Sequence, residues 1–371
     1  MRQKSISLDW TSLVERDFVF GVPNIRHATI IENRYFKKKN TKKTRKGRIY
    51  RFPTSLVKQF RYLKDRSRCT SGFRVEFITD SKSLEINAKW PRVSKMENMS
   101  PLAQQSIDIL VDGKHWTLVS PASCKLPNRF MLPNDKEEHK ITIVFPTYAP
   151  VKLRGLSLYR TGDGYPKKTS FEGAGSDKPV IFYGSSITQG GCATRPSLAY
   201  PHRLCQRLRL NYMNFGLSGA GRGETEIAEY IASFSDARLF ILDWGANLLA
   251  PEHQNALERR YRNFWKVIHE KNPETPILFI GLQHYFHGLI DSRAARKWIE
   301  SKRQFIKQEA EAACSEVNEG RDAPLFDYVD GPSIISYNDI GCTVDGTHPN
   351  DLGHKKYVDM LEWKVINLLQ V

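Results

Sequence analysis

The spacing of hydrophobic residues changes near residue 177 of this 371-residue chain. Before that point, short runs alternate polar and apolar residues. After it, continuous apolar runs of strand length alternate with longer stretches of helical periodicity. A period of two is typical of half-buried strands, whereas strict β/α alternation predicts a parallel sheet covered by helices. The chain therefore predicts two domains of different class.

The first part, 1–165, predicts an antiparallel β-sandwich. Within 73–79, the odd positions carry Phe, Val, Phe and Thr, and the even positions carry Arg, Glu and Ile. The tetrapeptide VDGK at 111–114 is a hairpin signal. Repeated short strands without long helices favour a sandwich. The expected strands are 71–80, 83–90, 106–119, 139–146 and 152–160.

A Gly-, Pro- and Ser-rich linker is expected at 166–176, followed by a doubly wound parallel sheet in 177–371. Ligands of such sheets bind beyond the carboxyl ends of the strands. The loops of interest are therefore 184–196, 216–223, 245–251, 283–291 and 330–350. The expected strands are 178–184, 211–216, 237–245, 276–282 and 324–329, and the expected helices are 200–210, 224–234, 253–272, 292–319 and 352–369.

Four of these loops carry the residue types that acyl transfer requires. A serine nucleophile needs a base, usually His, and the His needs a carboxylate that fixes its tautomer. The oxyanion that develops needs preorganised donors, such as a glycine N–H and an asparagine amide. The loops contain these groups within GSSIT (184–188), GLSG (216–219), GAN (245–247) and DGTH (345–348). Each residue also has an ordinary interpretation as a helix cap, a turn residue or a surface residue.

These four motifs, in this order, resemble those of the SGNH (GDSL-type) hydrolases. The resemblance implies a flavodoxin-like hydrolase domain, here preceded by a jelly-roll-like β-domain as in two-domain members. Aligned on Gly184, Ser185 takes the family's Asp position and Ser186 that of the nucleophile. His348 is then the base, oriented by Asp345.

The resemblance further implies an oxyanion hole made by the N–H groups of Ser186 and Gly219 and the side chain of Asn247. Two positions depart from the family pattern: Ser185 replaces an Asp, and Leu248 stands where an Asp commonly follows the Asn. The motif is not the G-x-S-x-G nucleophile elbow, because Thr188 stands where the second glycine belongs.

The implied activity is a serine esterase acting on small acyl esters, with O-acetyl groups on carbohydrates as the expected substrates. No cofactor or metal is expected. An acyltransferase with the same machinery and a non-catalytic glycan-binding protein remain alternatives. Arg195 and Arg222 lie in active-site loops, where they bind an anionic substrate group or form structural pairs. His284 is expected to line the substrate pocket; its loose spacing to His287 does not suffice for a metal site.

Charge and composition limit the partners. The net charge is +16, and residues 34–51 contain ten basic residues and no acid. No zinc-finger or RNP-like motif accompanies this segment, so we expect an exposed basic loop rather than a nucleic-acid site. Docking on an anionic polysaccharide stays open. No apolar run has the length of a signal peptide or membrane span, which predicts a cytoplasmic protein. The six scattered cysteines predict reduced thiols. The oligomeric state is left open.

Overall fold

The computed structural model describes residues 4–9, 12–13, 16, 18–21, 50–92, 95–121, 128–160, 165–169, 177–286 and 293–371. Most of the basic segment 34–51 therefore lies outside the described residues, as do Cys124 and His287. The five cysteines within the described residues form no disulfide.

The chain divides into two compact units. One comprises Met1–Pro53, Ser67–Ser170 and Arg195–Ser197, and the other comprises Thr54–Arg66, Phe171–Thr194 and Leu198–Val371. The sequence predicted domains at 1–165 and 177–371, joined by a linker at 166–176. In the structure, the segment 54–66 groups with the second unit and the segment 195–197 groups with the first, the β-unit.

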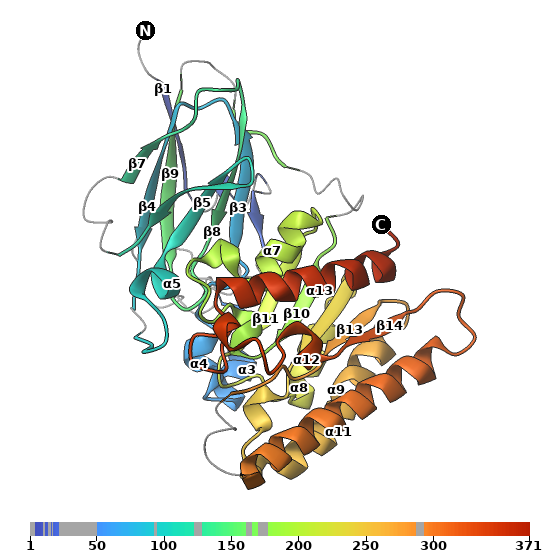
Figure 1. Ribbon diagram of the computed structural model, residues 1–371. Coiled ribbons are helices and arrows are strands. Elements are labelled where there is room, and N and C mark those ends of the chain that lie inside the picture. Colours follow the sequence, from blue (N-terminus) through green and yellow to red (C-terminus); the bar gives the residue numbers. More distant parts are fainter. Residues whose placement is uncertain are drawn as a thin grey trace. The chain divides into compact units, whose positions relative to one another are not determined.

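The first unit contains two antiparallel sheets (Figure 1). Apolar side chains from both sheets, such as Phe77, Leu84 and Ile143, form one buried cluster. The strand orders are β1-β9-β4-β7 and β2-β3-β8-β5-β6. Their bounds are β1 Lys4–Leu8, β2 Val19–Phe20, β3 Arg74–Thr79, β4 Ser83–Lys89, β5 Ile107–Val111, β6 Lys114–Val119, β7 Asn128–Met131, β8 His139–Val144 and β9 Lys152–Arg160.

The two charged residues on the second face of β3 are buried, although the period-two pattern of this strand predicted that this face is exposed. Arg74 and Glu76 are 1% and 4% exposed. They tolerate burial because they are paired: Arg74 Nε donates to Glu76 Oε1 at 2.8 Å, and Lys140 Nζ lies 2.9 Å from Glu76 Oε2. Buried charges persist where such partners compensate their lost hydration.

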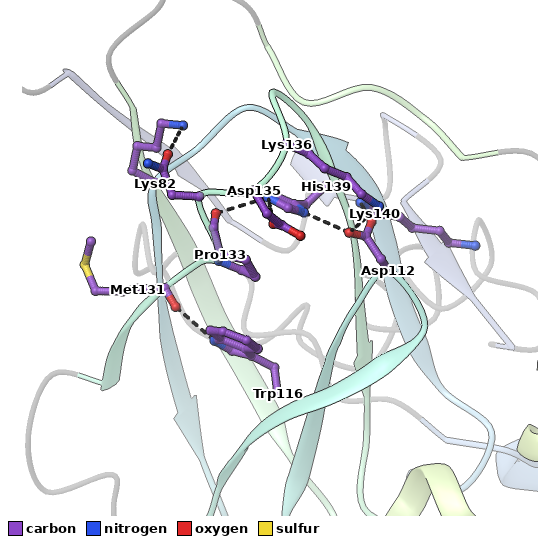
Figure 2. A network of polar contacts seen from close by, with 10 residues as sticks. Lys82, Asp112, Trp116, Met131, Pro133, Asp135, Lys136, His139 and Lys140 are labelled. Atoms are coloured by element: carbon purple, nitrogen blue, oxygen red, sulfur yellow. Dashed lines mark hydrogen bonds and ion pairs between the residues drawn. The ribbon is translucent and has the colours of Figure 1, made fainter.

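A polar network closes the turn between β5 and β6 (Figure 2). Asp112 adopts a left-handed φ of 50° in this turn. Its carboxylate accepts from the Lys140 N–H at 3.0 Å and lies 2.9 Å from His139 Nδ1. The opposite ring nitrogen of His139 is 3.1 Å from the Pro133 carbonyl. The predicted turn is thus tied to the start of β8.

The second unit is built on a parallel five-stranded sheet with the order β11-β10-β12-β13-β14 (Figure 1). The doubly wound sheet expected from the sequence is confirmed, and this order places the switch point between β10 and β12. The strand bounds are β10 Val180–Gly184, β11 Tyr212–Gly216, β12 Leu239–Asp243, β13 Ile277–Ile280 and β14 Phe326–Val329.

Helices cover both faces of this sheet. Along β10, Val180 and Phe182 join the buried cluster that contains residues of α7 and α13. Tyr183, the residue after Phe182, stacks on Phe264 of α9, with ring centroids 4.5 Å apart. The main helices are α7 Tyr200–Arg207, α8 Thr225–Ala232, α9 Gln254–Lys271, α11 Arg293–Asn318 and α13 Asp351–Leu369. Among the described helices, none combines the length and apolar character needed to cross a bilayer.

Short helices complete both units. They are α3 Thr54–Gln59, α4 Leu63–Arg66, α5 Pro101–Gln105, α6 Ser186–Gln189, α12 Gly331–Ile334 and the single-turn 3₁₀ segments η3 Pro196–Leu198, η4 Ala246–Leu248, η5 Pro251–His253 and η6 Ile340–Cys342.

Candidate active site

The two adjacent serines at the end of β10 have different structural roles. Ser185 is the N-cap of α6, and its hydroxyl oxygen accepts from the Ile187 N–H at 3.2 Å. Ser186 is the first residue of the helix. The capping role that serine commonly plays therefore belongs to Ser185. An Asp at this position would cap the helix in the same way. Ser185 therefore replaces the family's Asp without loss of the helix cap.

Ser186, His348 and Asp345 form a continuous hydrogen-bond relay. Ser186 Oγ is 2.8 Å from His348 Nε2, and His348 Nδ1 is 2.7 Å from Asp345 Oδ2. The carboxylate can only accept, so Nδ1 carries the proton and Nε2 is left to accept from the serine hydroxyl. The relay has the hydrogen-bond order of a Ser-His-Asp triad.

A local turn before α13 orients the Asp345 carboxylate. Its Oδ1 accepts from the N–H groups of His348 at 2.8 Å and Thr347 at 3.1 Å. Each carboxylate oxygen thus accepts a hydrogen bond: Oδ1 from the backbone and Oδ2 from the imidazole. The three-residue spacing predicted from the sequence supplies the whole arrangement locally.

Gly219 lies in the loop after β11 with a left-handed φ of 68°. A Cβ at this position would meet no atom within 4 Å, so the backbone conformation rather than space requires glycine. Within the described part of the chain, no acceptor takes the Gly219 N–H. This amide is consequently available to a ligand.

Asn247, in η4 after β12, contacts the same loop. Its Nδ2 donates to the carbonyls of Leu217 at 3.2 Å and Gly221 at 3.3 Å. Both amide hydrogens therefore serve the protein in this structure, through long hydrogen bonds. The amide predicted to stabilise an oxyanion lies at the loop that carries Gly219, but it must leave one of these carbonyls before it can donate to a substrate.

A buried carboxylate that the sequence motifs did not identify is hydrogen-bonded to α6. Asp243 ends β12, and it accepts from the hydroxyls of Thr188 at 2.8 Å and Tyr200 at 3.0 Å. Burial raises the pKa of Asp243 to about 6, against the lowering effect of the two hydroxyls. The backbone is tied as well, because Ser185 N–H donates to the Asp243 carbonyl at 3.2 Å.

The segment 54–66 also contributes to this unit. Arg66 Nε donates to the Ser218 carbonyl at 2.8 Å, and Tyr62 OH donates to Glu224. The Arg222 guanidinium lies 5.2 Å from the centre of the Tyr62 ring. These contacts connect positions more than 150 residues apart in the sequence, and no local pattern signals them.

The two arginines predicted to bind substrate have other contacts. Arg195 belongs to the β-unit, where its Nε lies 3.2 Å from Oδ2 of the fully buried Asp108. Structural pairing, the second interpretation offered for it, therefore describes this contact. Arg222 packs over the Tyr62 ring.

His284 follows β13 and is half-buried. Its ring packs edge-on against Phe286 and Tyr337. Burial, with the Arg303 charge as a smaller cause, lowers the pKa of His284. The imidazole lines a cavity of about 470 Å³ together with Tyr285 and residues of α11.

Cys192 lies beside the relay and completes a set of three metal-ligating side chains. Ligand atoms of Cys192, Asp345 and His348 lie within 4.8 Å of one another. Cys192 has a left-handed φ of 65°, which is uncommon for a residue with a side chain. Burial, followed by the Asp345 charge, raises the pKa of the Cys192 thiol to about 12. The thiol is thus protonated near neutral pH, and an ion would have to displace its proton.

Two family models match the chain. The family described as GDSL-like lipase/acylhydrolase matches residues 177–367, just over half of the chain. A second family, described as the N-terminus of SGNH-hydrolase-type esterases, matches residues 28–156. No curated protein matches the chain.

Solved structures share the fold at low sequence identity. A GDSL-like lipase from Bacteroides ovatus is 22% identical, with a TM-score of 0.74 and coverage of 100% of this chain and 98% of its own. The salicylyl-acyltransferase SsfX3 from a tetracycline biosynthetic pathway is 18% identical, with a TM-score of 0.74 and coverage of 99% of both chains. A family two carbohydrate esterase from Cellvibrio japonicus is 13% identical, with a TM-score of 0.56 and coverage of 100% and 99%.

The family matches extend over both parts of the chain, and the serine relay lies within the larger match. This chain therefore belongs to the GDSL-like lipase/acylhydrolase family and is a serine hydrolase with an N-terminal domain of the SGNH-esterase type.

Proposed function

We propose that the protein is an esterase that removes small acyl groups, O-acetyl groups foremost, from carbohydrates through an acyl-enzyme on Ser186. The observation that carries the proposal is the hydrogen-bond relay from Ser186 through His348 to Asp345. The relay supplies an activated nucleophile without any metal or cofactor.

The reaction proceeds in two halves. Ser186 Oγ attacks the ester carbonyl carbon while His348 Nε2 takes its proton, and Asp345 stabilises the imidazolium that forms. The oxyanion accepts from the N–H groups of Ser186 and Gly219 and from Asn247. His348 then protonates the departing alcohol. Water, deprotonated by the same imidazole, attacks the acyl-enzyme and regenerates Ser186.

Asn247 has a conditional role in this scheme. Its amide is held by two carbonyls at 3.2 and 3.3 Å, and these long bonds are exchangeable for a shorter one to an oxyanion. A charged acceptor forms a hydrogen bond roughly twice as strong as a neutral one. The exchange is therefore favoured in the transition state and not in the resting enzyme, which is the condition for catalysis.

Carbohydrate esters are proposed because family two carbohydrate esterases are among the proteins of similar fold. The test measures acetate release from O-acetylated oligosaccharides and from simple esters of increasing acyl length. We expect turnover to fall as the acyl chain lengthens. Activity on long-chain esters that equals or exceeds activity on acetyl esters would contradict the small-acyl assignment.

Acyl transfer to an alcohol is the second candidate, because the similar SsfX3 is a salicylyl-acyltransferase. The two activities share the acyl-enzyme and differ in the acceptor that attacks it. The test adds sugar or alcohol acceptors at increasing concentration and measures the ratio of ester product to free acid. This ratio distinguishes acyl transfer from hydrolysis. Dominant ester formation at millimolar acceptor would assign the protein as a transferase.

A further inference from the structure

We propose that Arg66, from the segment 54–66, positions the peptide that presents the Gly219 N–H to the oxyanion. The inference rests on the proposed function, because it assigns Arg66 a role in the acyl transfer carried out at Ser186. Arg66 lies in α4, and no motif of the hydrolase domain includes it.

The contact acts on the correct peptide group. Arg66 Nε donates to the Ser218 carbonyl at 2.8 Å. That carbonyl and the Gly219 N–H belong to one planar peptide unit. The unit is trans, because the structure has no cis peptide bond among its described residues. In a trans peptide the C=O and N–H point in opposite directions. Anchoring the carbonyl on one side therefore fixes the direction of the N–H on the other.

This peptide needs such an anchor. Gly219 has a φ of 68°, and a Cβ placed on it would meet nothing within 4 Å, so its backbone can rotate with little steric resistance. The flanking groups are held: Ser218 N–H donates to Gln189 Oε1 at 2.8 Å, and Gly221 N–H donates to the Leu217 carbonyl at 3.0 Å. Within the described parts of the chain, Arg66 is the donor that the Ser218 carbonyl accepts.

The charge of Arg66 adds to its geometric effect. A guanidinium that donates to a carbonyl polarises the peptide, and it thereby strengthens the N–H of the same peptide as a donor. The gain is largest when that N–H faces a negative oxygen. The contribution consequently increases as the reaction moves from the ester to the tetrahedral intermediate, so it acts on kcat more than on substrate binding.

Neighbouring contacts hold Arg66 in place. Leu63, in the same helix turn, is fully buried, and Tyr62 OH donates to Glu224 beyond the glycine loop. Gln59 Nε2 donates to Glu226 at 2.6 Å. Leu63 and Tyr62 thus hold the helix turn of Arg66, whereas the exposed Gln59 contact belongs to α3 and touches neither Arg66 nor the 218–219 peptide, so Gln59 offers a control position.

The test compares Arg66→Ala, Arg66→Lys and the control Gln59→Ala in the full-length protein. Losing one direct oxyanion donor costs about 10²–10³ in kcat, so we expect about 10–100-fold for Arg66→Ala, with KM changed by less than about threefold. Arg66→Lys should recover part of the loss, and Gln59→Ala should stay within about twofold of wild type, as expected for an exposed contact. Thermal melts establish that each variant is folded.

A trifluoromethyl ketone provides the readout that a merely structural role would not change. It adds to the serine and places a negative oxygen in the oxyanion hole. Its inhibition constant should rise in Arg66→Ala by the same factor by which kcat/KM falls. Unchanged inhibition, or equal losses in Arg66→Ala and Gln59→Ala, would overturn the inference while leaving the proposed function in place. A wild-type enzyme that fails to bind the ketone at all would overturn both.

Discussion

Replacing Asp345 by Asn tests the electrostatic logic of the relay with little change in shape. The orientation of the new amide is determined in advance, because the position of Oδ1 receives the N–H groups of His348 and Thr347 at 2.8 and 3.1 Å. The amide oxygen must take that position to remain an acceptor. The NH₂ group then takes the position of Oδ2 and faces His348 Nδ1 at about the present 2.7 Å.

Two donors cannot face each other, so the imidazole must change its tautomer. With the proton moved to Nε2, His348 donates toward Ser186 Oγ and can no longer accept its proton. The equivalent substitution in a serine protease lowers kcat by about 10⁴ with the geometry intact. A factor of 10⁴ corresponds to about 5.4 kcal/mol of activation free energy. We expect a loss of this size in Asp345→Asn.

The assay is steady-state hydrolysis of an acetyl ester, together with a thermal melt of each variant. Asp345→Asn should melt close to wild type, because the backbone hydrogen bonds of the turn are kept. Retention of more than a tenth of the wild-type kcat by a folded Asp345→Asn protein would refute the tautomer argument. Asp345→Ala is the companion variant: it removes the misplaced donor along with the carboxylate, and should lose no more activity than Asp345→Asn.

Three further predictions concern the surroundings of the site. The pKa of buried Asp243 is raised from 3.8 to about 6, because burial favours the protonated carboxyl group. The protonated group stabilises the fold fully below about pH 4, and this stabilisation is lost as pH rises through 6. Asp243→Asn should therefore gain stability relative to wild type above pH 6, by up to about 3 kcal/mol, with little change at pH 4. Denaturant unfolding at both pH values measures this, and an equal difference at both would contradict it. Gly223→Ala should cost at least about 2 kcal/mol, because φ is +68° and a Cβ would lie 2.1 Å from the Trp244 ring. Gly320→Ala, where φ is +71° and a Cβ would meet no neighbour, should cost only about 1 kcal/mol in the same denaturant titration. Equal losses of unfolding free energy in the two variants would contradict the steric argument. Zn²⁺ should inhibit by binding Cys192 with the two relay residues, more strongly as pH rises. Cys192→Ser should raise the inhibitory Zn²⁺ concentration at least tenfold. Unchanged inhibition in that variant would show that Zn²⁺ does not inhibit through Cys192.

The hydrolase fold was predictable because buried parallel strands are continuous apolar runs. All five expected strands and all five expected long helices of the second unit are present. The relay was equally accessible, since its residues lie in loops that a doubly wound sheet brings to one edge, and Asp345 and His348 are joined by a local turn. The hydrophobic alternation likewise identified the longer strands of the β-unit.

What the sequence missed depends on contacts between distant residues. The sequence did not predict the strands β1, β2 and β7, of which β2 and β7 span only two and four residues. The Arg66–Ser218 contact joins residues 152 positions apart, and the identity of Asp108 as the partner of Arg195 likewise depends on the tertiary fold. The present partners of Asn247 were also not predictable, because they depend on backbone carbonyls that carry no sequence signal.

The central claim is that Ser186 is the activated nucleophile. Reaction with a fluorophosphonate followed by peptide mass mapping tests it most directly, on wild type, Ser186→Ala and the control Ser185→Ala. Adduct on Ser186 in wild type and in folded Ser185→Ala, with none in Ser186→Ala, is the predicted result. Adduct on Ser185, or no adduct on any serine of the folded wild-type protein, would contradict the account.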